Sequence, residues 1–138
     1  MRLSEWEARR RLAGARVARL ATATATGRPH LVPVTFAVDG DRIYTAVDGK
    51  PKTTANLRRL RNIAENPQVS LLADHYSDDW RTLWWARADG CAAILTGAAD
   101  IQRPICLLTA RYPQYRASRP GGPVIAIAVT RWTAWSFT

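Results

Sequence analysis

The hydrophobic and polar positions of this chain alternate over much of its length with the two-residue period of β-strands. Short runs of this kind, rich in β-branched and aromatic residues, predict strands, and Gly, Pro, Asn and Asp clusters between them predict turns. The expected strands are residues 17–23, 30–38, 42–46, 69–74, 83–96 and 124–135. Asp39 and Gly40 form a hairpin turn signal between the second and third strands, and Gly90 predicts a bend in the fifth.

Three segments have helical patterns instead. Ser4 and Glu7 have the spacing of a capping box, and the helix that follows is expected to end at Gly14. In the second and clearest helix, apolar residues recur at helical spacing until Pro67 stops the pattern. A third helix is expected at 104–112. Because hairpin connections dominate this order, we predict a mainly β fold, a mostly antiparallel barrel with short helices, rather than a parallel doubly wound sheet.

Length and composition indicate one globular domain over residues 1–138. With 47% hydrophobic and 22% charged residues, the chain can bury a core. The longest apolar run, residues 124–129, is far shorter than the ~20 residues of a membrane-spanning helix, and residues 1–6 contain no apolar signal core. We therefore expect a cytoplasmic protein with no membrane partner. Cys91 and Cys106 are too few for a disulfide framework and are expected to be reduced, buried thiols.

The charge balance points to an anionic partner. The chain has 20 Lys and Arg against 11 Asp and Glu, a net charge of +9. All of the basic residues except Lys50 and Lys52 are arginine, and a coding bias toward Arg and Ala is an alternative explanation of the excess. The arginines do not interleave with aromatic residues on one expected face, which argues against nucleic acid as the partner.

Familiar catalytic and metal-binding signatures are absent from the sequence. It contains no G-x-S-x-G, H-E-x-x-H, phosphate-binding Walker loop or G-x-G-x-x-G, which argues against a self-contained hydrolase. Asp74, His75, Asp78 and Asp79 are the only cluster of ligand-type side chains, but a polar turn at a strand end has the same composition, and we predict no metal site. His30 stands alone at the start of a strand, and we interpret it as a packing residue rather than as an acid or base.

Residues 48–56 contain the pattern most suggestive of binding chemistry. Lys50 and Lys52 precede Thr53, Thr54 and Asn56 at the start of the second helix, and either threonine can cap that helix. Ammonium groups, hydroxyls and the unpaired N–H groups of a helix N-terminus together suit a phosphate. The alternative is a solvated loop in which the threonines serve only as caps.

Tryptophan is over-represented for a chain of this size. A 138-residue core cannot easily bury all six residues, and aromatic side chains left near the surface often belong to an interface or stack on a planar ligand. They are Trp6, Trp80, Trp84, Trp85, Trp132 and Trp135. Ordinary packing accounts for about half. A phosphate loop together with surplus aromatics suggests a phosphorylated planar heterocycle, such as a flavin or deazaflavin, and a homodimer that completes its pocket.

Several segments, in their order and spacing, resemble one known family over nearly the whole chain. It is that of the small split-barrel proteins related to pyridoxamine phosphate oxidase, and within it the PPOX-class deazaflavin (coenzyme F-420)-dependent oxidoreductases. The segments are residues 27–36, 50–52, 57–63, 66–67, 78–80, 84–85, 112–115 and 132–135. The link at 98–104 is several residues shorter than in those proteins, which leaves the third helix and any substrate contact there undefined.

The resemblance implies a six-stranded antiparallel split β-barrel that forms a homodimer, with the cofactor in a cleft between subunits. It places the cofactor phosphate at Lys50, Lys52, Thr53, Thr54 and Asn56. It places the tricyclic ring against Pro33, Val34 and Thr35. F-420 also carries an oligoglutamate tail, for which Arg58 and the positive net charge are suitable, whereas FMN has a phosphate but no such tail.

The implied activity is hydride transfer from reduced F-420 to an activated C=C or C=N bond of a small organic substrate. The sequence assigns no catalytic residue, and the product's proton could come from solvent, Tyr76 or His30. Two alternatives stay open. One is an FMN-dependent oxidoreductase, and the other is a protein that binds a flavin, haem or tetrapyrrole without turnover.

Overall fold

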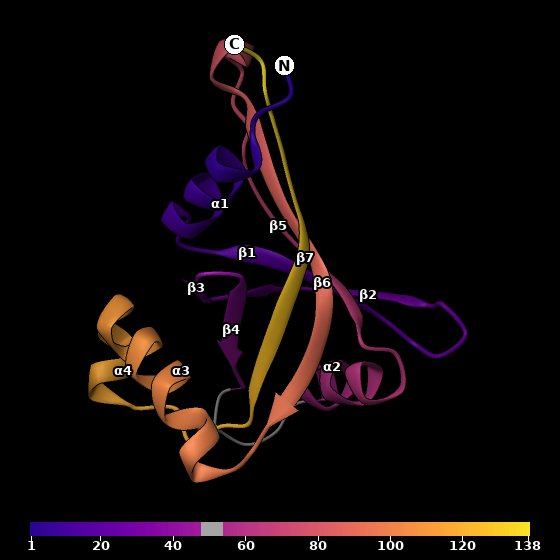
Figure 1. Ribbon diagram of the computed structural model, residues 1–138, viewed down its shortest axis with the longest axis vertical. Coiled ribbons are helices and arrows are strands. Elements are labelled where there is room, and N and C mark those ends of the chain that lie inside the picture. Colours follow the sequence, from indigo (N-terminus) through magenta and orange to yellow (C-terminus); the bar gives the residue numbers. More distant parts are fainter. Residues whose placement is uncertain (48–53) are drawn as a thin grey trace.

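The computed structural model describes residues 1–47 and 54–138 (Figure 1). Its helices are α1 (Glu5–Gly14), α2 (Thr54–Glu65), α3 (Ala98–Arg111) and α4 (Pro113–Ala117), with a short 3-10 turn at Trp80–Thr82. The strands are β1 (Ala18–Ala23), β2 (Pro29–Val34), β3 (Ala37–Asp39), β4 (Arg42–Ala46), β5 (Gln68–His75), β6 (Trp84–Leu95) and β7 (Val124–Ser136). The predicted mainly β class with antiparallel pairing and short helices is therefore confirmed.

The described strands form one antiparallel sheet in the order β2-β1-β5-β6-β7-β4-β3. Long β6 and β7 pair from Trp84 opposite Ser136 to Leu95 opposite Val124 and form the centre of the sheet. Their register shifts between Asp89 and Gly90, which confirms the predicted irregularity at this glycine. A side chain at Gly90 would come within 2.3 Å of the Ala128 carbonyl oxygen, so close pairing requires glycine here.

The prediction of six strands is wrong, because the expected strand 30–38 is divided in two. Its halves, β2 and β3, lie at opposite edges of the sheet and are joined by Thr35 and Phe36. The backbone N–H and carbonyl of Phe36 are hydrogen-bonded to the Tyr112 hydroxyl, at 3.1 and 2.9 Å, rather than to a strand. A two-residue link spans only about 10 Å. The sheet must therefore curl until its edges approach, although its ladder of hydrogen bonds is not closed.

The core fills the inside of this curled sheet. Its largest fully buried side chains include Phe36, Leu20, Ile43, Leu71 and Ile127. Helix α1 packs on β6 and β7, and α3 packs on β4 (Figure 1). The predicted N-cap is confirmed, since the Ser4 hydroxyl accepts a hydrogen bond from the Glu7 amide at 3.1 Å.

Two further expectations are corrected. The third helix begins at Ala98 rather than 104, so residues 98–104, interpreted as a link, form its first turns, with Pro104 inside the helix. Cys91 and Cys106, expected to be buried, are both exposed. Cys91 occupies an outward position between buried Gly90 and Ala92, because strand residues alternate between the two faces. Across the described helices, none is long and apolar enough to cross a membrane.

Candidate functional site

The residues predicted to bind phosphate lie mostly beyond the part of the chain that the structure describes. Lys50, Lys52 and Thr53 fall outside the described residues. Thr54 and Asn56 belong to the first turn of α2, but their side chains are likewise outside the description. The phosphate loop therefore stays a prediction.

The three residues predicted to line the cofactor ring end strand β2 and differ in burial. Pro33 is exposed, Val34 is only 6% exposed within the core, and Thr35 is half-buried just after the strand. Because its side chain is occupied by core packing, Val34 can offer a ligand only its backbone. Thr35 alone presents a polar side chain, and its Oγ1 lies 2.7 Å from the hydroxyl of Tyr115 on α4.

Thr35 opens onto a cavity of about 320 Å³ between the β2–β3 link and helix α4. We call it the Thr35 cavity; it is lined by Arg16, Thr35, Tyr112, Gln114 and Tyr115. Buried Tyr112 fixes its geometry, because its hydroxyl contacts both Phe36 and the Arg16 carbonyl oxygen, the latter at 3.0 Å. The segment before β1, the β2–β3 link and the end of α3 therefore meet at one phenol.

Arg16 brings a positive charge to this cavity, and Arg111 packs against the same tyrosine. The Arg16 guanidinium stacks 4.7 Å from the Tyr112 ring centroid and donates to the Arg111 carbonyl oxygen at 3.0 Å. Arg111 lies beside the rings of Phe36 and Tyr112 and donates to Ala15 and Phe36 carbonyl oxygens. Burial lowers the pKa of Arg111 from its usual value, and neighbouring Arg16 lowers it further. Phenols, an amide and a cation around one space suit the polar edge of a planar ligand.

Arg58 lies in a different cavity, of about 220 Å³, between the β1–β2 hairpin and α2. We call it the Arg58 cavity; its lining residues are Thr24, Arg28, Pro29, His30, Arg58 and Asn62. Asn62 is 1% exposed and donates to Thr22 Oγ1 at 3.0 Å, which fixes α2 against β1. The structure thus does not bring Arg58 and Thr35 into one cavity. Sequence reasoning named neither Arg28 nor Asn62 as a site residue, because they are far apart in the chain and line one cavity only through tertiary packing.

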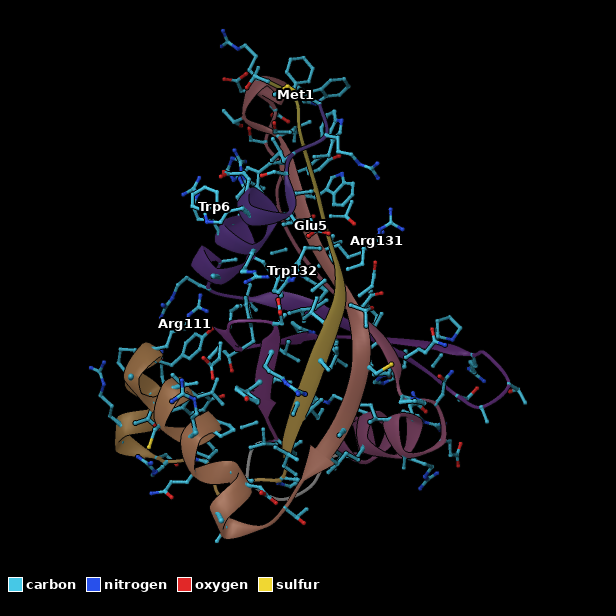
Figure 2. The ribbon with its side chains drawn as sticks, viewed as in Figure 1. Met1, Glu5, Trp6, Arg111, Arg131 and Trp132 are labelled. Carbon is cyan, nitrogen blue, oxygen red and sulfur yellow. The ribbon has the colours of Figure 1, made fainter. Side chains whose placement is uncertain are left out.

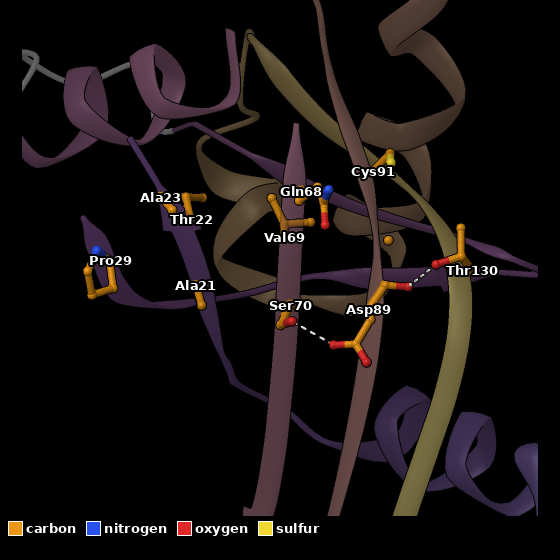
Figure 3. Close-up of a pocket in the computed structure, with 11 residues that line it drawn as sticks. Ala21, Thr22, Ala23, Pro29, Gln68, Val69, Ser70, Asp89, Cys91 and Thr130 are labelled. Carbon is orange, nitrogen blue, oxygen red and sulfur yellow. Dashed lines mark hydrogen bonds between the residues drawn. The ribbon is translucent and has the colours of Figure 1, made fainter. Parts of the chain in front are cut away.

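A third hollow, of about 400 Å³, opens on the outward face of β1, β5 and β6 (Figure 3). Ser70 donates to the Asp89 carboxylate at 2.6 Å, and Thr130 donates to the Asp89 carbonyl oxygen at 3.1 Å. Arg87 also bonds Asp89, so this carboxylate is already satisfied within the sheet. The described residues that line the hollow offer shape but no free charged group.

The same outward face carries apolar side chains beside this hollow. A neighbouring hollow of about 420 Å³ is lined by Leu72, Asp74, Tyr76, Trp85 and Arg87. Leu31, two strands away on β2, is 66% exposed. As predicted, the tryptophans are not all buried. Trp132 is buried beneath α1, whereas Trp6, 70% exposed, projects from the outer side of that helix (Figure 2).

The only acidic and histidine cluster in the sequence forms no metal centre in the described structure. Asp79 bonds Arg81 and caps the 3-10 turn, and those hydrogen bonds lower the pKa of the Asp79 carboxyl. Nowhere in residues 1–47 and 54–138 do three or more His, Cys, Asp or Glu side chains gather as metal ligands.

Comparisons with known proteins place this chain in a family. The model of the pyridoxamine 5'-phosphate oxidase family matches residues 5–136. The chain belongs to this family. Among curated proteins, it is similar to a 5a,11a-dehydrotetracycline/5a,11a-dehydrooxytetracycline reductase of Streptomyces rimosus, with 39% identity over 56 residues. That match covers 41% of this chain and 38% of the reductase.

Solved structures share the fold. An FAD-binding protein from Mesorhizobium loti matches with a TM-score of 0.74 and 21% identity, covering 97% of this chain and 95% of that one. HutZ, a haem storage protein from Vibrio cholerae, matches with a TM-score of 0.69 and 16% identity, covering 95% of this chain and 90% of that one. At these identities the likeness shows the fold alone.

Proposed function

We propose that this protein is an oxidoreductase that uses coenzyme F-420 to reduce an activated C=C or C=N bond of a small organic substrate. Membership of the pyridoxamine 5'-phosphate oxidase family over residues 5–136 is the observation that carries the proposal. The partial likeness to a reductase of dehydrotetracyclines supports the reductive direction and a small organic substrate.

The donors on the described surface fit a phosphorylated heterocycle with an acidic tail. The Thr35 cavity offers hydroxyl and amide groups and the Arg16 cation. The Arg58 cavity offers two arginines, and among the described residues neither guanidinium has a carboxylate partner. Cationic donors of this type suit carboxylates and phosphates.

The proposed binding mode assigns a role to each predicted residue. Pro33, the Val34 backbone and Thr35 hold the ring, and Arg58 takes tail carboxylates. The phosphate contacts are Lys50, Lys52, Thr53, Thr54 and Asn56. When bound in its reduced form, F-420 supplies the hydride, and the chain supplies orientation and charge.

Product protonation needs a donor near the ring. Tyr76 is 67% exposed on the outward sheet face, and His30 lines the Arg58 cavity, so neither lines the Thr35 cavity of its own subunit. Tyr115 does, and its hydroxyl shares a hydrogen bond with Thr35. We therefore add Tyr115 to solvent, Tyr76 and His30 as a proposed proton source.

A homodimer is part of the proposal. Leu31 is exposed on the outward sheet face, and Leu72 and Trp85 line a hollow on the same face; apolar surface of this kind is typical of a protein interface. A second copy of the chain on this face would cover the patch and could wall the cofactor cleft, as the resemblance implies.

A flavin is the second candidate cofactor, because the Mesorhizobium loti neighbour is an FAD-binding protein, and the fold shared with HutZ keeps a haem-binding role in view. The test is to mix the purified protein with F-420, FMN, FAD or haem, remove free ligand and record the absorbance spectrum. We expect F-420 to be retained most strongly at low salt, with its advantage over FMN narrowing as salt rises, because tail contacts are ionic.

Turnover separates an enzyme from a carrier. Reduced F-420 with a panel of activated alkenes and imines should be oxidised faster with the protein than without it. Equal or reversed affinities for F-420 and FMN would move the proposal to a flavin enzyme. Retention of a cofactor without any acceleration across the panel would favour a carrier.

A further inference from the structure

The Arg58 cavity has the composition of an anion site. The described residues that line it are two arginines, a histidine, a threonine, an asparagine and a proline, and none of these is a carboxylate. Its volume of about 220 Å³ corresponds to roughly seven waters at ~30 Å³ each, enough for a phosphate or carboxylate group with some hydration.

The hairpin that carries Arg28 is held in place before any ligand arrives. The Thr24 amide donates to the Arg28 carbonyl oxygen at 3.0 Å, and the Arg28 amide donates to Thr24 Oγ1 at 2.9 Å. Gly27, with φ of +96°, makes the tight turn between them possible. A rigid hairpin lowers the entropy lost when the arginine engages an anion.

The opposite wall is anchored just as firmly. Asn62 bonds Thr22, and Asn66, one turn further along the chain, donates to the Thr24 carbonyl oxygen at 3.2 Å. Both bonds tie the α2 segment to β1 and its hairpin. Arg58, one helical turn before Asn62, therefore lines the cavity from a fixed backbone.

His30 supplies a third donor. Its Nδ1 is buried and has no hydrogen-bond partner among the described residues. A proton on Nδ1 would lack an acceptor among these residues, so the ring nitrogen left to donate to an anion is Nε2.

We propose that the Arg58 cavity binds an anion, a phosphate or a carboxylate, held by Arg28, Arg58 and His30. The source is either a free anion or a carboxylate of an oligoglutamate chain, and both present the same oxygen acceptors to these donors. Strand β2 separates the site from the Thr35 cavity by five residues, about 17 Å along the strand. The carboxylate source rests on the proposed function, in which Arg58 takes the tail carboxylates, whereas the phosphate source requires no cofactor.

The protein contains only two histidines, which makes a direct test simple. Titration with inorganic phosphate, and separately with triglutamate, is followed by the imidazole ¹⁵N resonances at constant pH and ionic strength. We expect saturable shifts at His30, larger for Nε2 than for Nδ1, while exposed His75 on β5 serves as the internal reference. Tighter binding of triglutamate identifies a carboxylate chain as the preferred source, and tighter binding of phosphate identifies the free anion.

Three variants complete the test. Arg28→Gln and Arg58→Gln should each weaken binding about tenfold or more, since each removes a charged hydrogen bond. Arg61→Gln, an exposed arginine on α2 outside the cavity, should leave the affinity nearly unchanged. An absence of saturable shifts at His30, or equal losses in all three variants, would overturn the proposal in favour of diffuse surface charge.

Repeating the titration with the Lys52→Ala variant distinguishes binding in the Arg58 cavity from binding at the predicted phosphate site of the lysine loop. The His30 shifts and the phosphate affinity that they report should persist in this variant. If they disappear, the anion sits at the loop and not in the Arg58 cavity. Failure at His30 with F-420 still retained would leave the proposed function intact.

Discussion

The Thr35 and Tyr115 hydroxyls lie 2.7 Å apart, although 80 residues separate them in the chain. This hydrogen bond joins the link between β2 and β3 to the short helix α4. It therefore connects the strand expected to contact the cofactor to the least buried of the described helices. None of the five residues of α4 is buried, and its position therefore depends on few contacts such as this one.

Replacing Tyr115 by phenylalanine tests the contribution of this hydrogen bond. A half-buried hydrogen bond of this kind contributes about 1 kcal/mol, so Tyr115→Phe should lower the free energy of unfolding by about that amount. F-420 affinity or turnover should fall further if the hydroxyl also faces the ligand. Urea unfolding and cofactor titration measure the two effects. A stability loss with unchanged affinity and turnover would remove Tyr115 from the proposed proton sources.

Lys52 is predicted to hold the cofactor phosphate. It stands nearest the threonines and the α2 N-terminus, where amide donors favour an anion. Lys52→Ala should weaken F-420 binding by about one to two orders of magnitude and leave the apo melting temperature almost unchanged. Lys50→Ala is the matched comparison. A larger loss with Lys50→Ala would assign the phosphate to that lysine, and no loss with either would make the segment a solvated loop.

Gly90 is expected to be essential for pairing of β6 with β7. A Cβ there would meet the Ala128 carbonyl oxygen at 2.3 Å and Val129 Cα at 3.0 Å, and neither backbone atom can move without disturbing the sheet. Gly90→Ala should therefore destabilise the protein by at least ~2 kcal/mol in chemical denaturation. The control is Gly14→Ala, where no atom lies within 4 Å of the added Cβ, and it should be neutral or slightly stabilising. Similar effects at both positions would contradict the steric account.

The hydrogen bonds of Glu7 predict how the stability of the protein depends on pH in the acid range. Hydrogen bonds from Arg10 and Arg11 lower the pKa of its carboxyl from 4.5 to about 2. Because the folded-state pKa is the lower one, the stabilising contribution is present above pH 4.5 and is lost as the pH falls toward 2. The stability difference between wild type and Glu7→Gln should therefore shrink across this range and stay constant above it. A difference that does not vary with pH between 5 and 2 would show that the two ion pairs contribute nothing to folding.

The apolar side chains on the outward sheet face predict that the protein forms a homodimer. Light scattering at micromolar concentration should give twice the 15.4 kDa mass, with an interface above the ~1,200 Å² of stable complexes. Leu31→Asp places a charge in the apolar patch and should shift the protein toward monomer. Trp6→Asp, on the exposed side of α1, should not. A wild-type monomer would exclude the homodimer.

Local sequence patterns determined much of this molecule. The Ser4 cap, the strand alternation on either side of Gly90 and the stop at Pro67 depend on residues within a few positions of one another, so the sequence alone predicts them. The loop with the two lysines is also a local pattern, and its binding role stays a prediction.

Tertiary structure decided what depends on distant partners. Residues 30–38 have a continuous strand pattern, yet the Tyr112 hydroxyl, 76 positions away, binds the Phe36 backbone and divides the run into β2 and β3. Arg28 and Arg58 carry no shared motif, and only the packing of α2 on the β1–β2 hairpin lines one cavity with both. Hydrogen bonds and packing contacts of this kind form between segments that are far apart in the chain. The local hydrophobic periodicity carries no information about such contacts.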